Sequence, residues 1–202
     1  MSVENNQKEI EHFNRWSRTY DKSWIQHFAV PVHRDMLDVA ASTVSAPKSI
    51  LDIGCGTGQL LIKAAARWPS AILAGVDPAE GMVEIARSQA QGATIHLGDA
   101  ESLPFEDSSV DVVFSSISFH HWPDQPKALR EIARVLRPAG CLCIADMTMP
   151  GWLAIAIRHV KVKGPAAMVR LFTEAGLTVR LQRRSSTVFV LLTLGVKMSR
   201  NE

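Results

Sequence analysis

Cysteine is scarce in this sequence, with three residues among 202. The number is odd, and Cys141 and Cys143 both lie within one apolar run. A framework of disulfides, which holds many small secreted domains together, is therefore excluded as the organising feature. The composition instead predicts free thiols in a reducing, cytoplasmic compartment.

An excess of charge of one sign and a long hydrophobic run are lacking as well. The formal net charge is +2, too small to indicate nucleic acid or an anionic membrane as the main partner. The opening segment, MSVENNQKEIEHFNRW, has no apolar signal core. The longest apolar stretch near the end, 187–196, is about half of the roughly twenty residues that a membrane helix needs.

A basic cluster remains in the second half of the chain, formed by 158–163 with Arg180, Arg183 and Arg184. We interpret it as a solvated face. The alternative is a patch for peripheral contact with an anionic lipid surface or for tRNA.

The sequence does contain enough hydrophobic residues, 47% of the total, to form one compact core. We expect a single domain, 1–202, in three parts. A helical lid covers 1–45, with two amphipathic stretches separated at Pro31. A ligand-binding core covers 46–147, and a helix with closing strands covers 148–202.

Hydrophobic periodicity alternates between strand and helix after residue 48. Strands are expected at 49–54, 71–77, 93–99, 110–118, 140–146, 177–184 and 187–195, with helices at 58–69, 79–92, 125–138 and 166–176. This order predicts an α/β fold: a doubly wound, Rossmann-like, mostly parallel sheet of seven strands, with helices on both faces and an antiparallel final strand. In such a sheet, ligands lie beyond the carboxyl ends of the strands.

A glycine-rich turn follows the first of these strands, in SILDIGCGTGQLL. Its glycines are Gly54, Gly56 and Gly58, and Gln59 stands where the dinucleotide fingerprint G-x-G-x-x-G requires its last glycine. A phosphate-binding P-loop needs Lys followed by Ser or Thr, which is also missing. Neither phosphate-binding motif fits.

Three carboxylates accompany this turn: Asp52 within the first strand, Asp77 ending the second and Asp99 ending the third. They would repel a pyrophosphate but suit a cationic ligand that carries hydroxyls and amines. Asp77, about twenty residues after the glycines, is placed to accept hydrogen bonds from ribose hydroxyls. Taken singly, each Asp could instead cap a helix or form a turn.

Four segments in order resemble the motifs of class I S-adenosylmethionine-dependent methyltransferases. They are LDIGCGTGQL, GVDPAEGMVEIA, GDAESLPFEDSSVDVVFSSISFHHW and ALREIARVLRPAGCLCIAD. The branch typified by ubiquinone and menaquinone biosynthesis methyltransferases is the most similar, and FNRWSRTYD resembles its opening motif. One departure is Ala139, where the family usually has glycine.

The resemblance implies S-adenosylmethionine as cofactor and a role for each motif. Asp77 would hold the ribose, and Gly54 and Gly56 would border the methionine part. Asp52 would contact the cofactor's ammonium or bond the loop backbone. The other implied contacts are Pro78 and Met82 at the adenine, Asp99 with Ala100 and Glu101 at its amine, Ser116 to Ser118 closing the methionine part, and Tyr20 reaching over from the lid.

His120 and His121 follow the fourth strand, where the transferred methyl should lie. His121 is the candidate catalytic residue, as a general base near neutral pH. The alternative, which the sequence favours, is that the histidine only packs on the cofactor or caps a turn. Two adjacent histidines cannot easily turn to one ion and no third ligand is evident, so no metal site is predicted.

The resemblance implies methyl transfer to a small-molecule or lipid-like, quinone-type acceptor. One alternative is a SAM-binding module that transfers nothing, against which the intact pocket residues argue. Another is an RNA or protein methyltransferase. No Asn-Pro-Pro-Tyr-type motif follows the fourth strand, where 116–119 read SISF. The short connection 147–165 also favours a small acceptor.

Overall fold

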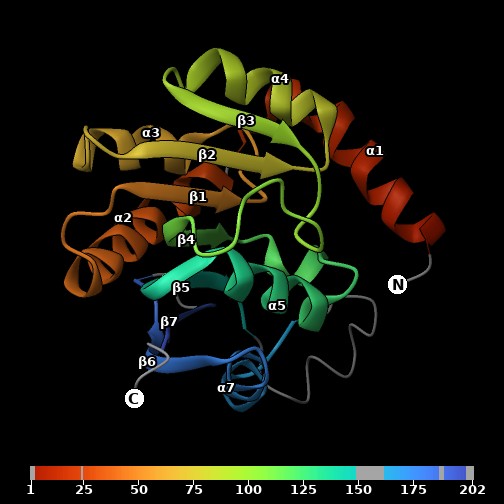
Figure 1. Ribbon diagram of the computed structural model, residues 1–202. Helices are drawn as coiled ribbons and strands as arrows, with labels where there is room; N and C mark the ends of the chain where they lie inside the picture. The colour runs from red at the N-terminus through yellow and green to blue at the C-terminus, as the bar shows by residue number, and fades with distance from the viewer. Residues whose placement is uncertain (1–2, 24, 149–161, 187–188, 199–202) are drawn as a thin grey trace.

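The computed structural model describes residues 3–23, 25–148, 162–186 and 189–198 (Figure 1). Its elements, in chain order, are α1 (Val3–Tyr20), α2 (Ile25–Thr43), β1 (Ser49–Ile53), α3 (Gln59–Arg67), β2 (Ile72–Asp77), α4 (Glu80–Gln89), β3 (Ala93–Leu97), β4 (Val110–Ser116), the 3-10 turn η1 (Phe119–His121), α5 (Gln125–Val135), β5 (Leu136–Met147), α7 (Pro165–Glu174), β6 (Leu177–Arg184) and β7 (Val190–Lys197).

The described strands form one sheet in the order β3-β2-β1-β4-β5-β7-β6. Strands β1 to β5 run parallel, and β7 lies antiparallel between β5 and β6. The predicted doubly wound sheet with an antiparallel final strand is confirmed. The chain winds outward from β1 to β3 and then returns to the other side of β1 at β4. This reversal places the switch point, where such folds bind ligands, between β1 and β4.

Helices cover both faces of the sheet because successive strand residues point to opposite sides. Ile50 packs in the core beneath α2, α3 and α4, whereas its neighbour Leu51 packs in the core beneath α5 and α7. Figure 1 shows α1 apart from both layers, lying along α4. Asn14 Oδ1 accepts a hydrogen bond of 2.9 Å from Gly81 N, which ties the two helices together.

Two expectations about element bounds are wrong. Pro31 does not separate the first helices but lies inside α2, and the break comes at 21–23 instead. A proline costs one backbone bond within a helix, and the buried side chains of Val32 and Met36 hold α2 on the sheet around it. The helix expected over 125–138 ends at Val135, because β5 begins at Leu136 and contains Ala139 at φ 63°.

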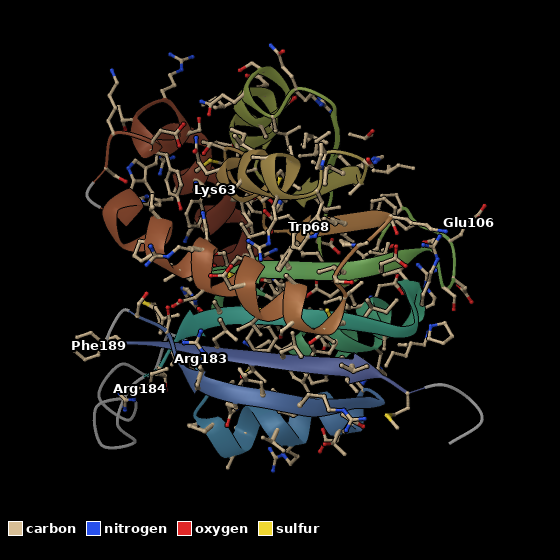
Figure 2. The ribbon with its side chains drawn as sticks, turned by 90° about the vertical axis from the view of Figure 1, so that its left-hand side faces the viewer. Lys63, Trp68, Glu106, Arg183, Arg184 and Phe189 are labelled. Atoms are coloured by element: carbon tan, nitrogen blue, oxygen red, sulfur yellow. The ribbon has the colours of Figure 1, made fainter. Side chains whose placement is uncertain are left out.

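The basic cluster is only partly described, since 158–161 lie outside the described residues. Arg183 and Arg184 end β6, at the same end of the sheet as the exposed Phe189 (Figure 2). Arg183 pairs with Asp35 of α2 at 3.7 Å. None of the helices within the described ranges is both long and apolar enough to cross a membrane.

Candidate active site

One pocket at the carboxyl ends of β1, β2, β3 and β4 brings the nominated residues together. Its lining includes Tyr20, Gly54, Gly56, Asp77, Pro78, Met82, Asp99, Ala100, Glu101, Ser116 and His121. Asp52 lies apart from these, in a smaller cavity that shares Tyr20, Gly54, Gly56 and Ser116 with the pocket. We refer to the two as the main pocket and the side cavity.

The turn after β1 keeps the backbone close to the main pocket. Gly54, Gly56 and Gly58 have φ of 69°, 54° and 83°, a region that side chains disfavour. A Cβ on Gly54 would also collide with the side chain of Ser118, which donates a 3.0 Å hydrogen bond to the carbonyl of Ile53. The first glycine is therefore required by conformation and by space.

Asp77 holds this turn as well as facing the main pocket. Its Oδ2 accepts a 2.9 Å hydrogen bond from Gly56 N, and its Oδ1 accepts one of 2.9 Å from Ala79 N. Burial raises the pKa of Asp77 to about 6, although these two bonds and the nearby His121 act to lower it. Each carboxylate oxygen has a second lone pair, so the group can still accept bonds from a ligand.

Three buried polar atoms around the side cavity have no hydrogen-bond partner among the described residues. They are Asp52 Oδ1, His33 Nδ1 and Ser116 Oγ. Burial and then the charge of Asp77 raise the pKa of Asp52, while burial and then Lys63 lower the pKa of His33 to about 3. Buried polar atoms are costly unless a ligand or an ordered water meets them, so these three make the side cavity a candidate site for a polar group. The expected bond from Asp52 to the loop backbone is not found at Oδ1.

The part of the main pocket that follows β2 and β3 combines apolar and acidic side chains. Met82 and Ala100 are buried there, beside Pro78. Asp99 Oδ1 accepts a 3.0 Å hydrogen bond from Glu101 N, so Asp99 forms a turn as well as facing the pocket. Burial raises the pKa of Glu101. Such a slot suits a flat, apolar ring with an amine at its edge.

The two histidines of η1 face different ways. His120 is buried, and its Nδ1 lies 2.6 Å from Asp146 Oδ1 of β5. His121 lines the main pocket, and its Nδ1 lies 2.5 Å from Glu9 Oε1 of α1. His120 therefore has a structural role, while His121 remains the candidate that can touch an acceptor.

Helix α1 contributes several residues, among them Tyr20, to the lining of the main pocket. Tyr20 packs edge-on against Trp16 with ring centroids 4.9 Å apart. Burial, followed by the charges of Asp77 and Asp21, raises the pKa of Tyr20. Asp21 accepts a 2.6 Å hydrogen bond from Thr57 Oγ1, which fastens the end of α1 to the glycine turn.

The cysteines take no part in this site as reactive groups. Cys141 and Cys143 are buried free thiols, and burial raises the pKa of both, as expected for inert core residues. Cys55 in the turn is also buried and free. Within the described ranges, no three side chains of His, Cys, Asp or Glu gather where they could hold a metal ion.

Comparison with known proteins gives one family match, a methyltransferase domain over residues 51–144. A malonyl-[acyl-carrier protein] O-methyltransferase of Methylococcus capsulatus is 40% identical in an alignment of 156 residues that covers 68% of this chain and 56% of the relative. A demethylmenaquinone methyltransferase of Thermus thermophilus is 38% identical in an alignment of 109 residues that covers 52% of this chain and 50% of the relative.

The chain thus spans about half the length of the curated relatives that it matches. Among solved structures, the YcgJ protein of Bacillus subtilis superimposes with a TM-score of 0.69 at 22% identity, covering 82% of this chain and 99% of that one. This likeness concerns the fold.

Proposed function

Because this chain belongs, through residues 51–144, to the class I S-adenosylmethionine-dependent methyltransferases, we propose that it transfers a methyl group from S-adenosylmethionine to a small-molecule acceptor. The observation that carries the proposal is the main pocket. Residues from the ends of β1, β2, β3 and β4 meet there around an acidic, glycine-bordered space with no basic phosphate cradle among the lining residues.

The residues present fit this cofactor. Asp77 would accept from the ribose hydroxyls, and Met82, Pro78 and Ala100 would enclose the adenine with Asp99 at its amine. The methionine part would extend along Gly54 and Gly56 to the side cavity. There the unpartnered Asp52 and Ser116 supply acceptors for an ammonium, and the buried His33 supplies a further polar contact.

When bound, the cofactor supplies a methyl group already activated on a positively charged sulfur. The protein's part is then to bring the acceptor in line and to exclude water. Phe13 of α1 and Trp122 after η1 line the main pocket on the side of His121. They give the acceptor an apolar wall, which favours an aromatic or lipid-like molecule over a highly charged one.

The acceptor class rests on the relatives and on this wall. One relative is named for malonyl-[acyl-carrier protein] and another for demethylmenaquinone, so both an acyl carrier and a quinone-type lipid are candidates. A protein that only binds the cofactor, or one that methylates RNA or protein, is the alternative. Peripheral contact with a lipid surface would suit a quinone-type acceptor.

Methyl transfer is tested by incubating the purified protein with radiolabelled S-adenosylmethionine and a panel of phenols, quinols, free and carrier-bound carboxylates, tRNA and protein. We expect label in one of the small-molecule classes. Label only in tRNA, or only in protein that carries no bound acyl group, would contradict the proposed acceptor. Tight cofactor binding without label in any fraction, including cell extract, would favour the binding module.

Cofactor binding should depend on pH through Asp77. Its raised pKa of about 6 means that the carboxyl takes up a proton below pH 6 in the free protein, whereas ribose hydroxyls and a nearby sulfonium favour the ionised form. Affinity should therefore fall by up to about tenfold per pH unit below 6, with release of one proton on binding. Calorimetry in two buffers of different ionisation enthalpy measures both.

The matched control for this dependence is Asp99→Asn, which removes a less buried carboxyl of the same pocket. In this variant the cofactor affinity should still fall below pH 6. Equal affinities at pH 5 and pH 7 would contradict the assignment to Asp77.

A further inference from the structure

The contact between α1 and η1 joins two side chains that are far apart in the sequence. Glu9 Oε1 lies 2.5 Å from His121 Nδ1, and both side chains are 31% exposed at the main pocket. Phe13, one turn further along α1, packs edge-on against the His121 ring with centroids 5.2 Å apart. The lid helix thus fixes this imidazole by a polar contact and by an aromatic one.

Building on the proposed function, we propose that Glu9 and His121 form a carboxylate–imidazole pair in which Glu9 positions His121 as the general base of methyl transfer. Ionised Glu9 can only accept, so the neutral imidazole carries its proton on Nδ1. Nε2 then has a free lone pair, and no partner for it is found in the described part of the chain.

The neighbouring histidine shows why the pair is assigned this role. His120 and Asp146 form the same kind of contact at 2.6 Å, but their side chains are only 6% and 7% exposed and neither lines the main pocket. That contact holds η1 on β5. The contact between Glu9 and His121 is at the pocket, where an acceptor can reach the ring.

The proposed step balances in atoms and charge. The acceptor heteroatom forms a bond to the methyl carbon while the carbon–sulfur bond breaks and its electron pair goes to sulfur. The acceptor's proton passes to Nε2 of His121. The positive charge that leaves the sulfonium then resides on the imidazolium, where Glu9 compensates it. This applies to an acceptor that must lose a proton, such as a phenol or enol.

Other titratable groups face the ring of His121. Asp77, at the end of β2, interacts electrostatically with His121. The ring of His120 of η1 lies tilted beside it, with centroids 3.9 Å apart, and is itself paired with Asp146 of β5. Only Glu9 contacts a ring nitrogen of His121 in the described residues, so Glu9 is the group that sets which nitrogen carries the proton.

The test is the tautomer of His121 in the cofactor-free protein, read from nitrogen chemical shifts and assigned with His121→Gln. In the wild type we expect the proton on Nδ1. In Glu9→Gln the side-chain amide can donate as well as accept, so the preference should shift toward the Nε2 proton. Glu11→Gln, an exposed carboxyl on the same helix, is the matched control and should leave the tautomer unchanged.

Turnover of the acceptor found in the radiolabel panel supplies the second readout. Glu9→Gln should lower kcat by about 100-fold while KM for the acceptor and Kd for the cofactor change less than threefold. A wild-type tautomer with its proton on Nε2, or an unchanged kcat in Glu9→Gln, would overturn the pair's role. Failure of the proposed function itself would appear differently, as absent cofactor binding with the predicted tautomer still present.

Discussion

Replacing Asp77 by alanine is expected to weaken S-adenosylmethionine binding by more than about 100-fold. The carboxylate would hold two ribose hydroxyls, and hydrogen bonds to a charged group contribute about 1.5–3 kcal/mol each. The variant also removes the acceptors for Gly56 N and Ala79 N, which lie 2.9 Å from Asp77 in the wild type. The glycine turn would then lose part of its support.

Titration calorimetry with the cofactor measures this effect, and circular dichroism checks that the fold persists. Asp38→Ala is the matched control, because Asp38 is a carboxylate with 55% of its side chain exposed, paired with Arg67 rather than placed in the main pocket. It should bind like the wild type. An affinity of Asp77→Ala within about threefold of the wild type would refute the ribose assignment.

Replacing Gly54 by alanine is the second change with a large expected effect. The new Cβ would lie 2.5 Å from Ser118 Cβ, and φ at this position is 69°. Relief requires movement of Ser118, which bonds both the Ile53 carbonyl and Ser115 Oγ. We expect the free energy of unfolding to fall by about 2–4 kcal/mol, with loss of measurable cofactor binding.

The variant Gly92→Ala separates the effect of the positive φ from the effect of the collision with Ser118. Gly92 also has a positive φ, 88°, but an added Cβ would meet nothing within 4 Å, so this variant reports backbone strain alone, about 1 kcal/mol. Urea unfolding of both variants gives the comparison. Equal losses in Gly54→Ala and Gly92→Ala would show that the collision with Ser118 is unimportant.

The sheet could be predicted because its central strands are continuous apolar runs, each followed by a helix with a single apolar face. The carboxyl ends of parallel strands meet at one edge, so residues after those strands had to come together. This reasoning alone predicts that Asp77 and Asp99, which are far apart in the chain, lie at one site, and both line the main pocket.

Residues outside the strand ends were not predictable in the same way. Glu9 meets His121 across 112 positions of sequence, and nothing in the periodicity of α1 indicates that contact. The position of His33 is not predictable for a similar reason. It lies on α2, within the segment that the sequence predicts as the lid, yet it lines the side cavity with Asp52 and Ser116. The prediction of a break at Pro31 is wrong because the packing of α2 outweighs one lost backbone bond.

We expect the main pocket and the side cavity together to hold S-adenosylmethionine. A crystal structure of the protein grown with that cofactor shows directly whether they do. The ribose hydroxyls should lie on Asp77, the adenine beside Met82 and the amino-acid tail at Asp52. A cofactor bound elsewhere, or with its adenine in the side cavity, would overturn this placement.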